Sequence, residues 1–227
     1  MIVKQYMDVK KFMEVAGQKT NNTPTHVSYN VANFRLTLIR EELFGSNELV
    51  ESMQRDNRVG VLDGICDVLY VVYGAMATYG ITPDDYTHVP TPYASSIPTA
   101  GRTNYLIRSL KNVFDKYERD IFNDDLYEIR KSAESLISIV IGIADEFNLD
   151  VEGAFEEVHS SNMSKFCFTE YDAEHAIQVR LDEGKTDYLA AVVVKLTDEY
   201  FGIKRAVDGK ILKPLSFFEP SLEKFLK

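Results

Sequence analysis

The chain has 227 residues, of which 45% are hydrophobic and 26% are charged. This length and composition can bury a substantial core and are typical of a globular protein. The formal net charge is −10, so the chain offers little of the positive charge that binding to a nucleic-acid strand requires. Its two cysteines, Cys66 and Cys167, lie far apart and lack zinc-ligand spacing, which favours a reduced, cytoplasmic protein.

The N-terminal segment MIVKQYMDVKKFMEV mixes charged and apolar residues, so it lacks the continuous apolar core of a signal peptide. No stretch approaches the ~18 uninterrupted apolar residues of a membrane span. We therefore expect neither a targeting segment nor a membrane partner.

Apolar residues at helical spacing predict the first elements of the fold, at about 8–16, 31–54 and 58–79. The second helix contains Gly45, where we expect it to be loosened. The third is apolar over most of its circumference and should pack deeply. Residues 80–101 are rich in Pro, Thr and Ser, which predicts a long loop that closes over a substrate.

Helical spacing returns between 102 and 147, and a shorter helix follows at about 151–163. A short helix at 171–183 precedes β-branched runs and a DG turn, which predict a hairpin or small sheet at about 187–213. The chain should thus have a mainly α fold with a small C-terminal β-hairpin appendage. We expect one domain over 1–227, with a bundle at about 31–165, a loop insertion at 80–101 and an α/β appendage at about 170–214.

Acidic residues gather around the second and third predicted helices. Glu41 and Glu48 are seven residues apart and would share one face of a continuous helix, whereas Asp63 and Asp67 share a face of the next. If these faces meet, the carboxylates repel one another unless a cation neutralises them. A small set of hard oxygen ligands that leaves room for water and substrate phosphates suits Mg²⁺, which suggests a phosphate-bearing substrate. Alternatively, the glutamates are ordinary solvent-exposed residues on a helix surface. This alternative explains the presence of Asp63 and Asp67 less well, because the helix that contains them is mostly apolar.

Two segments in this region also carry a resemblance. RLTLIREEL followed by LDGICDVLYVVYGAMATYGI resembles the all-α nucleotide pyrophosphohydrolase superfamily, which includes MazG-like, phosphoribosyl-ATP pyrophosphohydrolase-like and dimeric dUTPase-like proteins, particularly its phage and bacterial members. FEEVHSSNMSKF and DGKILKP resemble later elements of the same group. The resemblance spans roughly 30–80 and 126–214. It implies an all-α helical bundle, a homo-oligomer such as a dimer or tetramer, and a location in the host cytoplasm if the protein is phage-encoded.

The resemblance further implies an Mg²⁺-dependent reaction, with Mn²⁺ as an alternative ion, in which a nucleoside triphosphate and water give the monophosphate and pyrophosphate. The family holds the metal with an EExxE element and an ExxD element. Glu41 and Glu42 match the first two glutamates, and Asp67 matches the aspartate. Either Glu41 or Glu42 is the expected activator of the attacking water.

Two positions depart from the family motifs. Gly45 stands in place of the third glutamate of EExxE, and Gly64 in place of the glutamate of ExxD. We assign Glu48 and Asp63 as replacement metal ligands. In a rival register, Glu48 and Glu51 form the ExxE pair.

Asn162, Lys165 and Lys210 are the predicted substrate-binding residues. Asn162 and Lys165 match family positions that approach the nucleotide, and an ammonium group suits a phosphate. Lys210 lies beside the predicted DG turn. The alternative for Asn162 and Lys165 is a polar helix end with a favourably placed lysine.

Two other functions stay open at this point. One is cleavage of phosphoribosyl-ATP, although the predicted loop and hairpin are unusual in compact versions of that enzyme. The other is a catalytically weakened protein that only binds nucleotides, which Gly45 and Gly64 suggest. The leading interpretation is a nucleotide pyrophosphohydrolase that adjusts nucleotide pools or removes non-standard nucleotides.

Overall fold

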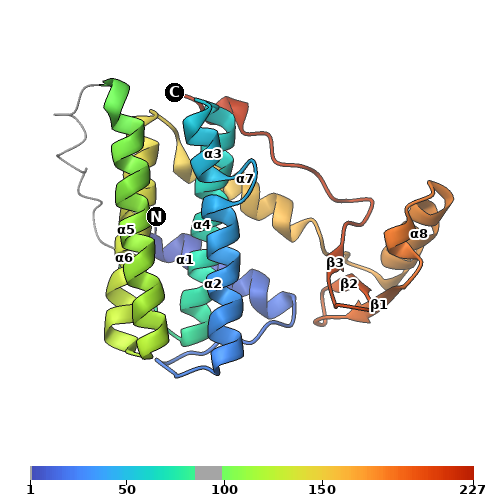
Figure 1. The fold of residues 1–227 in the computed structure, drawn as a ribbon. Helices are drawn as coiled ribbons and strands as arrows, with labels where there is room; N and C mark the ends of the chain where they lie inside the picture. Colours follow the sequence, from blue (N-terminus) through green and yellow to red (C-terminus); the bar gives the residue numbers. More distant parts are fainter. Residues whose placement is uncertain (1, 85–98) are drawn as a thin grey trace. The chain divides into compact units, whose positions relative to one another are not determined.

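The structure is a computed structural model that describes residues 2–84 and 99–227. The chain is mainly α-helical, as predicted, with a small antiparallel sheet near its C-terminus (Figure 1). Most of the loop predicted at 80–101 lies outside the described residues. The helices are α1 (Ile2–Val15), α2 (Tyr29–Phe44), α3 (Leu49–Gln54), α4 (Arg58–Tyr79), α5 (Thr99–Asn123), α6 (Leu126–Glu146), α7 (Val151–Met163) and α8 (Glu170–Asp182).

Contacts group the chain into two compact units. The first comprises Met1–Lys10, Thr20–Glu156 and Leu222–Lys227, and the second comprises Lys11–Lys19 and Glu157–Ser221. Helices α1 and α7 therefore contribute residues to both units. The prediction of one domain over the whole chain stays a prediction.

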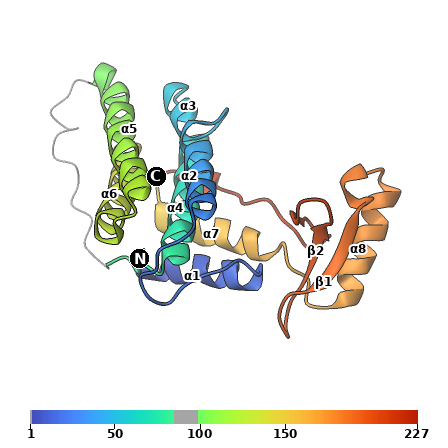
Figure 2. The ribbon, with the colours of Figure 1, turned by 60° about the horizontal axis from the view of Figure 1, so that its bottom comes forward.

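The first unit is a bundle built around α4. Helices α2, α4, α5 and α6 run side by side in both ribbon views, and α4 packs against α2, α3 and α6 (Figures 1 and 2). Asn57 caps the start of α4 by accepting a hydrogen bond from the Gly60 backbone N–H, and Gly80 ends the helix at φ +67°. The deep packing predicted for this helix is confirmed, because Ile65, Leu69 and most of its other residues are buried.

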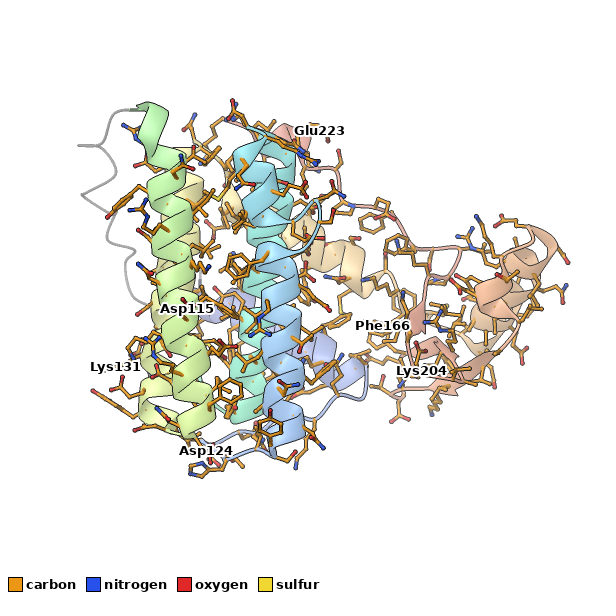
Figure 3. All side chains as sticks on the ribbon, in the orientation of Figure 1. Asp115, Asp124, Lys131, Phe166, Lys204 and Glu223 are labelled. Carbon is orange, nitrogen blue, oxygen red and sulfur yellow. The ribbon has the colours of Figure 1, made fainter. Side chains whose placement is uncertain are left out.

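The bundle also contains α5, in the part of the chain where helical spacing returns. It packs along α6. The ring centroid of its Phe114 lies 5.5 Å from that of Phe44 in α2. At its C-terminal end, Asp124 contacts the imidazole Nδ1 of His26 at 2.8 Å (Figure 3). Helix α5 therefore completes the wall of the bundle beside α2 and α6.

By length and composition alone, α4 could cross a membrane, and it is the one helix of this kind among the described residues. However, 67% of its most apolar window is buried inside the protein. This burial is what the central helix of a bundle requires.

The second unit joins α8 to a three-stranded sheet of order β1-β2-β3, with β1 at Ala191–Lys195, β2 at Phe201–Arg205 and β3 at Ile211–Leu212. Val193 pairs with Ile203, which pairs with Leu212. The predicted DG turn lies between β2 and β3, where Gly209 has φ +72°. A small core joins α8 to the sheet and comprises Cys167, Ala173, Ala176, Tyr188, Ile203 and Leu212. Phe166 and Lys204 belong to this unit (Figure 3).

Arg58 joins three backbone segments of the first unit. Its Nη2 donates hydrogen bonds to the carbonyl oxygens of Phe147, Asn148 and Lys227 at 3.0, 3.1 and 3.0 Å. Phe147 and Asn148 end α6, where backbone carbonyls lack helical partners. Arg58 thus holds the end of α6 and the C-terminal segment to the start of α4.

We expect Arg58→Met to lower the free energy of unfolding by about 2 kcal/mol, because charge-assisted hydrogen bonds to backbone carbonyls are lost. Urea denaturation measures this change. Arg119→Met, at an exposed position of α5, is the control and should change the free energy by less than about 0.5 kcal/mol. Equal effects of the two substitutions would contradict this role for Arg58.

Candidate metal centre

Three carboxylates from three helical segments meet in the first unit. Glu42 comes from α2, Glu48 immediately precedes α3, and Asp67 comes from α4. One oxygen from each lies within 4.8 Å of the others, and all three side chains are half-buried. We call these three residues the carboxylate group.

The carboxylate group forms because the chain breaks between α2 and α3. The sequence predicted one helix over 31–54, which was wrong at Gly45, where α2 ends in extended backbone. Asn47 follows at φ +67° before α3 begins. On an unbroken helix, Glu42 and Glu48 would point about 120° apart. The turn instead brings Glu48 beside Glu42, whereas the sequence had placed Glu48 on the face of Glu41.

Gly64 gives α3 its position against α4. A Cβ atom added to Gly64 would lie 2.8 Å from the Cα and 2.9 Å from the N of Leu49. The backbone of α3 thus occupies the space that the motif glutamate of ExxD would need. Likewise a Cβ at Gly45 would lie 2.5 Å from the carbonyl oxygen of Glu41 and 3.0 Å from the Cγ of Glu48. Both glycines therefore make room for the segment that carries Glu48.

Glu51, which the alternative ExxE register pairs with Glu48, makes contacts outside the carboxylate group. Its carboxylate accepts a hydrogen bond from the Asn47 backbone N–H and forms an ion pair with Arg55. Arg55 also donates to the Asn47 side-chain oxygen at 3.0 Å. Glu51 thereby fixes the turn that precedes α3, and it is not a member of the carboxylate group. Sequence reasoning missed this role, although the i, i+4 spacing of Glu51 and Arg55 is a usable signal.

Burial and neighbouring negative charges both disfavour the ionised acids. Burial raises the pKa of Glu42 to about 7, and the negative charges of Glu48, Glu41 and Asp63 add to this rise. Burial and the charge of Asp63 also raise the pKa of Glu48. A divalent cation would relieve both the repulsion and the cost of burial, so the donor set fits a hard ion such as Mg²⁺ or Mn²⁺.

The remaining predicted acids, Glu41 and Asp63, lie at the margin of the carboxylate group. Both side chains are exposed, and both act on the group through their charge. The close set of three contains neither residue. Their assignment as metal ligands stays a prediction.

The predicted substrate-binding residues all belong to the second unit. Lys165 Nζ donates a hydrogen bond to Asn162 Oδ1 at 2.6 Å, near the end of α7. Lys210 follows the β2–β3 turn, and its backbone N–H donates to Asp208 Oδ1 at 3.2 Å. The pairing of Asn162 with Lys165 is consistent with a joint role, which stays a prediction.

The raised pKa of Glu42 makes the stability of the metal-free protein depend on pH. Between 4.5, its ordinary pKa, and about 7, the folded protein binds more protons than the unfolded chain. Stability should therefore fall as the pH rises through this window. Urea denaturation in EDTA at about pH 5 and about pH 8 measures the fall. Glu42→Gln should reduce this pH dependence, and an unchanged dependence would contradict the role of Glu42.

Comparison with known proteins identifies the class. Residues 9–88 match the family model of phosphoribosyl-ATP pyrophosphohydrolase, and this range contains the whole carboxylate group. The resemblance is thus confirmed over this range, because the matching family model belongs to the MazG-like and phosphoribosyl-ATP pyrophosphohydrolase-like nucleotide pyrophosphohydrolase superfamily.

One relative covers nearly the entire chain. It is "Uncharacterized protein L479" of Acanthamoeba polyphaga mimivirus. The two sequences are 26% identical over an alignment of 245 positions, which covers 98% of this chain and 95% of the relative. No solved structure matches the chain significantly. The similarity to the viral protein therefore extends beyond the family domain into the second unit.

Proposed function

We propose that the protein is a Mg²⁺-dependent pyrophosphohydrolase that converts a ribo- or deoxyribonucleoside triphosphate and water to the monophosphate and pyrophosphate. The convergence of Glu42, Glu48 and Asp67 in the family domain is the observation that carries this proposal. Family membership supports a pyrophosphohydrolase-type activity, and the carboxylate group adds a place for the ion.

Glu42, Glu48 and Asp67 would hold the metal through their carboxylate oxygens. When bound, Mg²⁺ supplies positive charge that neutralises the substrate phosphates and makes the α-phosphorus more open to attack. The chain itself contributes three half-buried carboxylates whose oxygens lie within 4.8 Å of one another, so the ligands are gathered before the ion binds.

Glu41 or Glu42 would accept the proton of the attacking water. The water oxygen forms a bond to the α-phosphorus, and the bond from that phosphorus to the oxygen bridging to the β-phosphate breaks, so that pyrophosphate leaves. Glu41 is exposed beside the carboxylate group and has room for a water molecule. We further propose that Asn162, Lys165 and Lys210 bind the nucleotide, and that the protein is a cytoplasmic homo-oligomer.

A second candidate reaction is cleavage of phosphoribosyl-ATP, which the description of the matching family model favours. A pyrophosphate-release assay tests both reactions. Purified protein is incubated with Mg²⁺ and each of the eight common nucleoside triphosphates and deoxynucleoside triphosphates, and separately with phosphoribosyl-ATP.

We expect EDTA-sensitive release of pyrophosphate and the matching monophosphate from at least one triphosphate. Turnover of phosphoribosyl-ATP alone would select the second candidate. No turnover of any of these substrates with Mg²⁺ or Mn²⁺ would favour a protein that only binds nucleotides and would contradict the proposal.

A further inference from the structure

The first unit contains a cleft of about 490 Å³ at the end of α4. Its walls come from the segment around Asn22 and Pro24, from residues 80–84 and from the first turns of α6. Thirteen residues of helix separate Asp67 from Gly80, which corresponds to about 20 Å at 1.5 Å per residue. The cleft is therefore distinct from the carboxylate group, and it has the volume of a small-molecule pocket.

One wall of the cleft is anchored to α4. The backbone N–H of Asn21 donates to Ala77 O, and that of Thr25 donates to Tyr79 O, both at 2.9 Å. Gly80 allows the close approach, because a Cβ there would lie 2.0 Å from a carbonyl oxygen of the same segment. This wall is consequently formed before any ligand binds.

The opposite wall is anchored to α6. Arg130 forms ion pairs with Asp84 and Glu134, and the Asp84 backbone N–H also donates to Glu134 at 3.4 Å. The guanidinium at the cleft is thus already paired with two carboxylates, and these three side chains together carry a net negative charge. An isolated phosphate ion is therefore a poor match, whereas a neutral group with a hydrogen-bonding edge fits.

The surfaces of the cleft suit a flat ring. Ile81 is buried and two prolines, Pro24 and Pro83, line the cleft with it. Tyr127 is 61% exposed at the edge of the cleft, and the face of its ring opposite Lys131 can stack on a ligand. Asn22 and Thr82 supply an amide and a hydroxyl that can pair with ring nitrogens and exocyclic groups.

We propose that this cleft binds the base of a nucleoside or nucleoside monophosphate, independently of the carboxylate group. Two lysines near the cleft would contact a phosphate if the ligand carries one. Lys131 Nζ lies 4.4 Å from the centre of the Tyr127 ring, and Lys10 Nζ donates to Asn22 Oδ1 at 2.6 Å. This inference does not rest on the proposed hydrolytic activity.

The test is an NMR titration of the full chain in EDTA with adenosine, guanosine, cytidine, uridine and their 5′-monophosphates. EDTA removes the divalent ions that would attract phosphates to the carboxylate group. We expect saturable shifts of the amide signals around Ile81, Thr82 and Tyr127 with at least one ligand. If a monophosphate binds more tightly than its nucleoside, and Lys131→Gln removes this difference, the phosphate is part of the ligand. Equal affinities would show that the base suffices.

Two variants and a control separate the cleft from other surfaces. Tyr127→Ala should weaken binding about tenfold, which is the effect of losing one base–aromatic stack. Thr82→Trp should abolish binding by filling the cleft. Tyr29→Ala, which removes another exposed aromatic ring, should leave the affinity unchanged. The proposal is overturned if no ligand gives saturable shifts, or if both cleft variants bind as the unaltered protein does.

Discussion

Asp67→Asn should lower the rate of pyrophosphate release by about two to three orders of magnitude, the size of effect seen when one charge-stabilising group is removed from an active site. Asparagine keeps the shape of the side chain but removes the negative charge that would hold the ion. Folding should survive, because Asp67 has an oxygen within 4.8 Å of two other carboxylates, and removing one of three close negative charges lowers their mutual repulsion. Initial rates at saturating nucleotide and Mg²⁺ measure the change.

The thermal stability of Asp67→Asn distinguishes a metal ligand from a purely structural acid. Without metal, the variant should be as stable as the unaltered protein or slightly more stable. An ion that binds only the folded state stabilises it by about 2.7 kcal/mol at a concentration a hundredfold above its dissociation constant. Because the variant should bind Mg²⁺ more weakly, added Mg²⁺ should stabilise it less than it stabilises the unaltered protein. A structural acid would show the reverse pattern: lower stability and unaltered turnover in the folded fraction.

Asp115→Asn is the matched control for Asp67→Asn. Asp115 is a half-buried acid on α5 of the same bundle, outside the carboxylate group (Figure 3). We expect its turnover to stay within about twofold of the unaltered protein, in keeping with surface substitutions away from a site. A large loss in both variants would mean that the bundle, and not the ion, is sensitive to the loss of an acid.

Gly64→Ala should reduce turnover at least tenfold at limiting Mg²⁺, because the new Cβ would lie 2.8 Å from the backbone of Leu49. Alanine gains about 1 kcal/mol over glycine in a helix, whereas overpacking costs about 1–3 kcal/mol. Global stability should therefore fall by no more than about 2 kcal/mol, while α3 moves away from α4 and carries Glu48 out of the carboxylate group. Isothermal titration with Mn²⁺ measures the affinity for the ion, and activity assays measure the turnover.

Gly64→Glu tests the same geometry from the other side. It restores the glutamate that the ExxD motif has in the family. If Gly64 were simply a lost ligand, this variant should be more active than the unaltered protein. We expect it to be less active than Gly64→Ala, because the larger side chain meets the same backbone. Higher activity in Gly64→Glu would contradict the assignment of Glu48 as the replacement.

Features that depend on neighbours along the chain were predictable from sequence. The helix at 58–79 is confirmed as Arg58–Tyr79 because its apolar pattern continues between a capping residue, Asn57, and a terminating glycine, Gly80. The β2–β3 turn is confirmed because the DG dipeptide fixes the local backbone. In both cases local preferences and the packed fold agree.

The position of Glu48 depends on contacts that sequence spacing does not show. Apolar residues such as Leu49 and Met53 continue the helical pattern beyond Gly45, so a single helix over 31–54 was a reasonable prediction. The helix breaks at Gly45, and the following α3 lies with its Leu49 backbone against Gly64 of α4. Only that tertiary contact shows that Glu48 joins Glu42 and Asp67, and that Glu51 fixes the turn instead.

A crystal structure of the protein with Mn²⁺ and a non-hydrolysable nucleoside triphosphate, with anomalous diffraction measured at the manganese edge, tests the central claim most directly. The account predicts a manganese peak bound by carboxylate oxygens of Glu42, Glu48 and Asp67, with the nucleotide phosphates on the same ion. A peak at which Glu48 is not a ligand would contradict the replacement of the motif glutamates. A nucleotide bound with no manganese at these three residues would contradict the proposed metal centre itself.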